Sequence, residues 1–306
     1  GMMGGADYFV ETLQLALANV EPVESGFDET NVLPSAALTI FLRDDLQLRG
    51  AFGRTVSRPL FNELSPSLFF DPDSGQQFLG NANLVQTEID GFDLRAEWYP
   101  STTESATLGV FRKDYTNPLE RTFLPDSGGA FTATFQNADE AVVTGVEFGG
   151  RLELGRLRGW FGGPALLDSI YLSANAAVLD SEVTLADQQA ATSRVRPLEG
   201  QADLVINLQI GLDTDDHDFT VAFNRVGERL RQVGVFNQPD VLQAPLDVLD
   251  VNYTWSIDDA WTLKVSGSNL LNATVRLTQQ LDGQEAVIWR EFQRGRGLGL
   301  GISYAL

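Results

Sequence analysis

The chain ends with Arg296-Gly-Leu-Gly-Leu-Gly-Ile-Ser-Tyr-Ala-Leu306, which alternates between two kinds of side chain. Successive side chains of a strand point to opposite faces, so one face of this segment is small or polar and the other is apolar. The apolar positions are Leu298, Leu300, Ile302, Tyr304 and Leu306. Such an ending is typical of the last strand of an outer-membrane β-barrel. In a soluble protein it would be an apolar edge that invites aggregation.

The composition limits the classes of protein that fit. The chain has 306 residues, of which 43% are hydrophobic and 21% are charged, and it contains no Cys. Its net charge of −21 repels phosphate backbones, so we expect no nucleic-acid partner. It contains no run of 18 apolar residues that would form a transmembrane helix, whereas barrel strands need only about ten alternating residues. We expect one β-barrel domain over residues 1–306.

The N-terminal residues lack the features of a secretion signal. The segment Gly1 to Asp7 has no basic residue, and the mildly apolar stretch from Tyr8 to Val20 is interrupted by Glu11. Gly1 before Met2 resembles the remnant of a purification tag. If the parent protein is exported, we expect this chain to be a piece from its C-terminal side.

Alternation with a period of two recurs along the whole chain and predicts about twelve antiparallel strands. The connections between them alternate in length. The short connections are Asp44-Asp45, Tyr99 to Thr103, Gly155 to Pro164, Asp213 to Asp216 and Ile257 to Asp259. The long connections cover roughly 19–34, 57–87, 117–139, 181–197, 228–244 and 270–295. This alternation predicts an up-and-down transmembrane barrel with short periplasmic turns and long extracellular loops.

Aromatic residues gather at the ends of strands that border the short connections. They are Trp98, Tyr99, Trp160, Phe161, Tyr253, Trp255 and Trp261. Indole and phenol rings favour the boundary between lipid headgroups and hydrocarbon, so the placement indicates an interfacial girdle. The same placement also fits aromatic side chains that pack a soluble core.

The segment Asp45 to Pro66 contains a predicted strand followed by Arg58-Pro-Leu-Phe-Asn-Glu-Leu64 at the start of a loop. This segment is the most specific of several that resemble the C-terminal barrel portion of TonB-dependent outer-membrane receptors. Further matches occur in the expected order, with Ala82 where the family usually has Pro and Leu306 where Phe is commonest. They are Asn31 to Leu38, Gly80-Asn-Ala-Asn-Leu84, Glu88 to Trp98, Lys113-Asp-Tyr-Thr-Asn-Pro118, Val143-Thr-Gly-Val-Glu-Phe148, Ser268-Asn-Leu-Leu-Asn272 and the final Gly301, Tyr304 and Leu306.

The resemblance implies uptake of a scarce nutrient across the bacterial outer membrane, such as an iron chelate, cobalamin or a carbohydrate. The family's barrel has 22 strands around a plug domain and receives energy from an inner-membrane protein. About twelve strands are expected here, without the plug or the N-terminal strands. The implied partners are outer-membrane lipid, the plug, the inner-membrane protein and a small-molecule ligand. A twelve-strand piece has two open edges, which predicts a smaller closed barrel or self-association.

The polar clusters give little sign of a metal or catalytic site. Asp213-Thr-Asp-Asp-His-Asp218 lies at a predicted hairpin, where Asp is a common turn former, and His217 is the only His in the sequence. We expect His217 to be a solvated turn residue. Gly297, Gly299 and Gly301 alternate and precede no helix, so they do not form a nucleotide-binding loop. We expect no cofactor, no metal and no enzymatic activity. The sequence alone leaves open catalysis by two carboxylates that are far apart in the chain.

Candidate ligand contacts are polar residues expected in the lumen or in the long loops. They are Arg54, Arg58, Asn62, Glu63, Arg95, Trp289 and Arg290. A charge-assisted bond between Arg58 and Glu63 would stabilise the loop without touching a ligand.

Two other classes stay open at this stage. A complete small barrel acting as a pore or a lipid-active enzyme would be a full-length protein. A soluble β-rich carbohydrate-binding or hydrolytic domain would fold without detergent.

Overall fold

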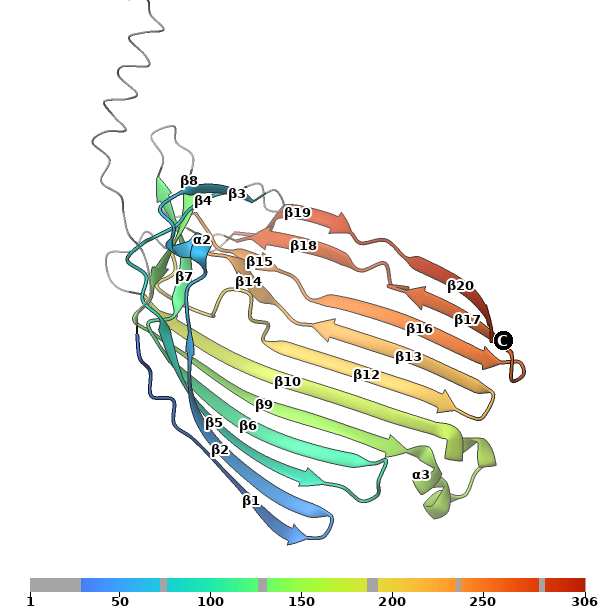
Figure 1. The fold of residues 1–306 in the computed structure, drawn as a ribbon. Coiled ribbons are helices and arrows are strands. Elements are labelled where there is room, and N and C mark those ends of the chain that lie inside the picture. Colours follow the sequence, from blue (N-terminus) through green and yellow to red (C-terminus); the bar gives the residue numbers. More distant parts are fainter. Residues whose placement is uncertain are drawn as a thin grey trace, which may run out of the picture.

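The computed structural model describes residues 29–71, 76–125, 131–185, 192–234, 238–280 and 284–305. Long antiparallel strands lie side by side in one curved sheet, with chain neighbours also neighbours in the sheet (Figure 1). Within the described residues this sheet has 12 strands, which confirms the predicted antiparallel up-and-down arrangement. The strands along the sheet are β1 (Ser35–Arg43), β2 (Leu46–Ser57), β5 (Thr87–Trp98), β6 (Ser105–Thr116), β9 (Glu140–Glu153), β10 (Ile170–Thr184), β12 (Leu204–Asp213), β13 (His217–Val226), β16 (Leu246–Ser256), β17 (Trp261–Ser268) and β20 (Gly297–Tyr304), while the short β11 (Val195–Arg196) pairs with β10.

The long connections carry secondary structure that the sequence analysis treated as loops. One small sheet joins two of these connections and contains β3 (Leu68–Asp71), β4 (Gln76–Leu79), β8 (Phe131–Asn137) and β7 (Leu119–Pro125). A second small sheet contains β14 (Arg229–Gln232), β15 (Val241–Gln243), β18 (Thr274–Gln279) and β19 (Val287–Gln293). The helix α2 (Phe61–Leu64) lies at the same end of the molecule (Figure 1). Partners such as β4 and β8 come from different connections, so the pattern within one connection does not reveal the pairing.

The strand register sorts the side chains of the main sheet into two faces. On the apolar face, Leu94 pairs with Val110, and Val110 pairs in turn with Val146. The same face continues to the last strand, where Val265 lies opposite Leu300. It is uncovered, since Leu300 keeps 74% of its surface exposed. The opposite polar face carries side chains such as Arg95, Glu147, Asn175, Asn207 and Asn224.

The buried core lies where the small sheets meet the main sheet. One cluster contains Val241, Leu246, Ala273, Val275 and Leu277, from the segments around β15, β16 and β18. A second cluster contains Ala138, Ala141, Val183 and Leu185, beside the loop ends of β9 and β10. Burial of apolar surface therefore stabilises the loop-bearing end of the molecule.

The opposite end of the sheet carries the short connections and the last described residues (Figure 1). The predicted turn from Gly155 to Pro164 is instead largely helical, because α3 (Leu154–Phe161) and the short 3-10 helix η1 (Ala165–Ser169) fill the connection from β9 to β10. Aromatic residues pack together at this end, where the tilted rings of Trp261 and Tyr304 have centroids 4.8 Å apart. No helix in the described part of the chain is long and apolar enough to span a membrane.

Candidate functional site

The polar face of the main sheet carries side chains that hydrogen-bond across strands. Arg95 on β5 donates to Glu147 on β9 at 3.4 Å, although β6 lies between these two strands. Further along the sheet, Asn207 on β12 donates to Asn175 at 2.6 Å and accepts from Asn224. Such pairs hold long polar side chains in fixed positions above a small-residue surface. The polar face therefore presents hydrogen-bonding groups in fixed positions, and we call it the polar wall.

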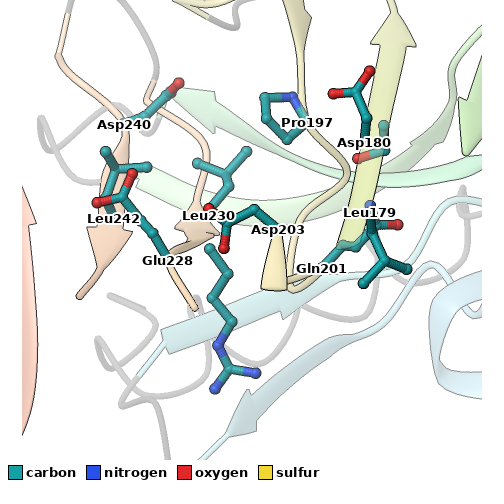
Figure 2. Close-up of a pocket in the computed structure, with 11 residues that line it drawn as sticks. Leu179, Asp180, Pro197, Gln201, Asp203, Glu228, Leu230, Asp240 and Leu242 are labelled. Atoms are coloured by element: carbon teal, nitrogen blue, oxygen red, sulfur yellow. The ribbon is translucent and has the colours of Figure 1, made fainter. Parts of the chain in front are cut away.

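A cavity of about 260 Å³ opens in this region, where β10 and β12 separate near the loop-bearing end. Residues of β10, of the segment that leads into β12, and of the β14 and β15 segments surround it (Figure 2). Strand alternation continues beyond β12, because Ala202 bridges Arg229, and it places Asp203 and Glu228 on the polar face. Asp180 lies on the apolar face with Val178, so the cavity opens between the strands and is lined by side chains from both faces.

The cavity is acidic. Its surrounding residues include four carboxylates and a single arginine, namely Asp180, Asp203, Glu228, Asp240 and Arg229. The Arg229 guanidinium donates to the side-chain oxygen of Gln243 at 3.0 and 3.2 Å. Burial lowers the pKa of Arg229 below its ordinary value, and the nearby charges of Arg231 and Arg294 lower it further. Among the residues that line the cavity, four carboxylates outnumber one arginine, and this excess favours positive charge.

Next to the cavity, two buried ion pairs join the loops. Arg196 on β11 donates to Glu120 on β7 at 2.7 Å, and only 2% and 4% of these side chains are exposed. Arg121 pairs with Glu199. Burial raises the pKa of Glu199, and Arg121 opposes that effect only in part. Because a buried charge without its partner is strongly unfavourable, the pairs fix β11 against β7.

The predicted contacts near the start of the connection 57–87 are engaged in local structure. Arg54 lies on the apolar face with Phe52 and binds Asp90 through two bonds of 2.7 Å. Glu63 accepts the backbone N–H of Leu60 at 2.7 Å and so caps α2. Among the described residues, Glu63 bonds to the Leu60 backbone and forms no ion pair with Arg58.

The other predicted contacts lie in two separate places. Arg95 belongs to the polar wall and is held by Glu147. Trp289 and Arg290 lie on β19, whose seven residues are all exposed. The Arg290 guanidinium lies 5.4 Å from the ring centroid of Phe292. The structure thus does not bring the predicted contacts together at one site.

Sequence reasoning missed the residues of the cavity. Asp203 and Glu228 are 25 positions apart in the numbering and become neighbours only through the hairpin of β12 and β13. The one available signal in the sequence was that Asp203 precedes β12 and Glu228 follows β13.

Asparagines of the family-like segments position the loops. Asn117, Asn269 and Asn272 have φ values of 54°, 51° and 53°, a left-handed conformation that Asn tolerates better than most residues. Asn269 also donates to the carbonyl of Gly295 at 2.5 Å and accepts the N–H of Ala273 at 2.8 Å. Gly80 is needed for a close approach, because a Cβ there would overlap the Ser65 carbonyl oxygen. These residues set where the long connections leave the sheet.

His217, the only histidine in the sequence, is held in place by contacts with Tyr253. His217 begins β13 and is half-buried, with Nδ1 2.9 Å from the Tyr253 hydroxyl, so it is not the solvated turn residue that we expected. Its ring stacks on Tyr253 at 6.0 Å between centroids. Within the described ranges, no group of three His, Asp or Glu side chains is arranged to hold a metal ion. Leu306 lies outside the described residues.

Comparison with known proteins gives one family and a group of similar structures. A family model described as TonB dependent receptor-like, beta-barrel matches residues 8–270. A mutant of the ferric enterobactin receptor PfeA from Pseudomonas aeruginosa is 17% identical, with a TM-score of 0.59 over 90% of this chain. The ferric yersiniabactin uptake receptor FyuA from Yersinia pestis is 16% identical over 90% of this chain, with a TM-score of 0.57.

The siderophore receptor PirA from Acinetobacter baumannii is 18% identical over 79% of this chain, with a TM-score of 0.55. The alignments cover 40% of the PfeA chain and 37% of both the FyuA and PirA chains. No curated protein sequence matches this chain.

Proposed function

Because the chain belongs to the TonB-dependent receptor-like β-barrel family, we propose that it forms the wall of an outer-membrane receptor that imports a small-molecule nutrient. The observation that carries the proposal is the sorting of one sheet into an exposed apolar face and a hydrogen-bonded polar face. The apolar face would contact the hydrocarbon of the outer membrane, and the polar face would line the lumen. A barrel satisfies backbone polar groups between strands, which is a requirement for crossing lipid.

Transport through this wall would depend on parts outside the chain. A plug domain would lie against the polar face, where Arg95, Glu147 and the asparagines offer fixed hydrogen-bonding groups. Displacement of such a plug costs free energy, which an inner-membrane energy-transducing partner would supply. The wall itself would stay rigid, because its strands are joined by continuous hydrogen-bonded ladders.

The ligand class that best fits the described residues is an iron chelate of neutral or positive charge. Iron uptake is supported by the similar solved structures, which are siderophore receptors. The charge follows from the cavity, where Asp203, Glu228 and two further carboxylates surround one arginine. A strongly anionic chelate would be repelled from this cavity.

Binding to the purified full-length protein tests this proposal. Ferric chelates of positive, neutral and negative charge would be titrated, and tryptophan fluorescence would report binding. We expect the positively charged chelate to bind most tightly at low salt, since screening weakens the attraction. The variant Asp203→Asn should weaken its binding about tenfold, or about 1.4 kcal/mol.

A matched control lies on the same hairpin. Asp218 is an exposed aspartate on the polar face at the opposite end of the β12–β13 hairpin. Asp218→Asn should leave binding unchanged. Preferential binding of the anionic chelate would overturn the proposed ligand charge, and failure to bind any chelate would overturn the proposed ligand class.

A further inference from the structure

The helix α3 encloses an apolar groove at the rim that carries the short connections. The groove has a volume of about 320 Å³. The sheet contributes side chains of its apolar face, including Trp98, Phe148 and Leu172, and α3 contributes Leu157 and Trp160. The groove therefore continues the apolar surface of the sheet and gives it a concave pocket at one edge.

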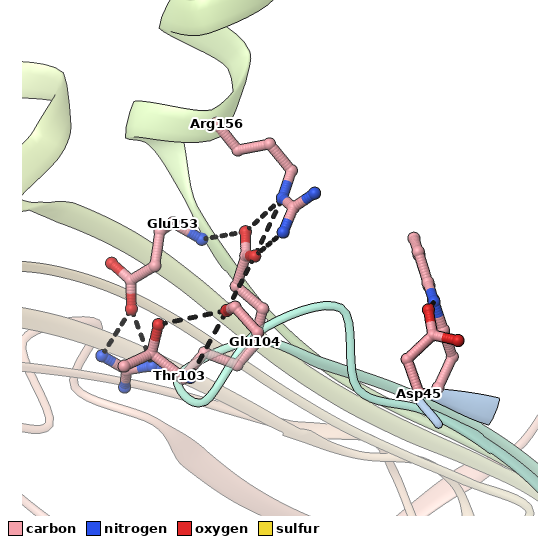
Figure 3. Close-up of polar contacts among 8 residues, drawn as sticks. Asp45, Thr103, Glu104, Glu153 and Arg156 are labelled. Carbon is pink, nitrogen blue, oxygen red and sulfur yellow. Dashed lines mark hydrogen bonds and ion pairs between the residues drawn. The ribbon is translucent and has the colours of Figure 1, made fainter. Parts of the chain in front are cut away.

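Ion pairs hold α3 in place beside the groove. The Arg156 Nε lies 2.8 Å from both carboxylate oxygens of Glu104, which precedes β6 (Figure 3). The Glu104 side chain is only 4% exposed, and the hydrogen bond from Arg156 lowers its pKa in spite of burial. Arg158 binds Asp168 of η1 at 2.9 Å. The helix is thus anchored at two points and is not a freely moving turn.

The C-terminal end of α3 carries two aromatic side chains that no described residue covers. Trp160 and Phe161 are 67% and 83% exposed. Large aromatic side chains with this exposure are favoured at the boundary between headgroups and hydrocarbon. No hydrogen bond from Nη1 of Arg156 is formed within the described residues, so this group can donate to a phosphate beside the groove.

We propose that the groove under α3 binds one acyl chain of a phospholipid, whose phosphate accepts a hydrogen bond from Arg156. Three observations support a lipid as the occupant. The groove is continuous with the apolar face, it is enclosed by apolar side chains, and a guanidinium lies at its polar boundary. The inference concerns the membrane contact of the barrel and does not depend on which nutrient is transported.

Photo-crosslinking of the full-length protein in phosphatidylglycerol vesicles tests the proposal. A phosphatidylglycerol with a diazirine in its acyl chain would be the probe, and peptide mass spectrometry would locate the adducts. We expect adducts on residues 98–106 and 154–174 to exceed those on β17 and β20 about tenfold, which corresponds to about 1.4 kcal/mol. A diazirine-labelled diacylglycerol, which has the acyl chains but lacks the phosphate, should label the groove much less.

Filling the groove gives the decisive comparison. Ala174→Phe or, if that variant does not fold, Ala106→Phe should remove the excess labelling, since both alanines border the groove. The control is Ala36→Phe, on the same apolar face but opposite Phe52 in the first strand pair. Uniform labelling of the apolar face, unchanged labelling in the filled variants, or crosslinks between protein copies instead of to lipid would overturn the proposal.

Discussion

At the residue scale, the ionisable groups of the loops are governed by burial as much as by pairing. Glu199 has a carboxylate oxygen, Oε2, that is buried without a hydrogen bond among the described residues, although its other oxygen is paired with Arg121. Glu104, by contrast, receives several bonds from Arg156, and its pKa is lowered. The same residue type therefore has opposite pKa shifts at the two ends of the sheet, because desolvation dominates at one and hydrogen bonding at the other.

The raised pKa of Glu199 predicts a stability that depends on pH. A carboxyl group whose pKa is higher in the folded state binds more protons there, so its contribution is fully present below the unfolded value of 4.5 and is lost as pH rises through the folded pKa. Above that pH the folded state must hold a buried charge that the unfolded chain keeps in water. Resistance of the segment 192–200 to limited proteolysis should therefore decrease over this pH range.

The variant Glu199→Gln keeps the shape of the side chain and cannot ionise. It should remove this pH dependence, whereas Glu182→Gln, at an exposed position of β10, should leave it intact. The same pH profile in wild type and Glu199→Gln would contradict the prediction.

At the element scale, each long strand of the main sheet directs apolar side chains to one face and polar side chains to the other. On β12, Leu208 lies on the apolar face opposite Ala174, and the adjacent Gln209 lies on the polar face, where it donates to the Tyr171 hydroxyl at 2.9 Å. A shift of one residue in the register would exchange the two faces. The register of the strands is thus determined by the alternation of side chains more than by any single contact.

A matched pair of substitutions on β12 tests which face meets lipid. Leu208→Arg should destabilise the folded barrel by about 2–4 kcal/mol, because a charge near the middle of the hydrocarbon is unfavourable. Gln209→Arg should cost only about 1 kcal/mol, the usual contribution of the lost hydrogen bond. Denaturant titration of the full-length protein folded into vesicles measures both values, and an equal cost for the two variants would refute the assignment of the faces.

At the scale of the whole molecule, the main sheet is curved and has two outer strands. Within the described residues, β1 and β20 each pair on one side only, with β2 and β17. Both strands expose apolar side chains, with Leu298 at 86% and Phe41 at 73% of their surface. Unpaired edges of this kind are templates for pairing with another strand.

We therefore expect residues 29–306, when isolated in detergent, to form dimers or larger assemblies at increasing protein concentration. A protein that carries the remaining strands of the proposed closed barrel should stay monomeric. Light scattering after size-exclusion chromatography measures both masses. A monomer of the isolated chain at all concentrations would show that its edges are satisfied within one copy.

The sequence by itself determined the main sheet of this molecule and its two faces. A period of two residues along β12 or β20 fixes which side chains share a face, because strand geometry leaves only two directions. The alternation of short and long connections then fixed the antiparallel order, and the family-like segments around Arg58 and Asn269 indicated the type of barrel. These features are local, so they can be read along the chain.

The tertiary structure alone decided how the connections fold and which residues they bring together. The cavity joins Asp203 to Asp240, β4 pairs with β8 from another connection, and Arg196 meets Glu120 across 76 positions. It also placed Arg54 on the apolar face and turned a predicted Gly-rich turn into α3. Such contacts join segments that are far apart in the sequence and depend on how many strands are arranged in space. Residue spacing along the chain therefore does not reveal them.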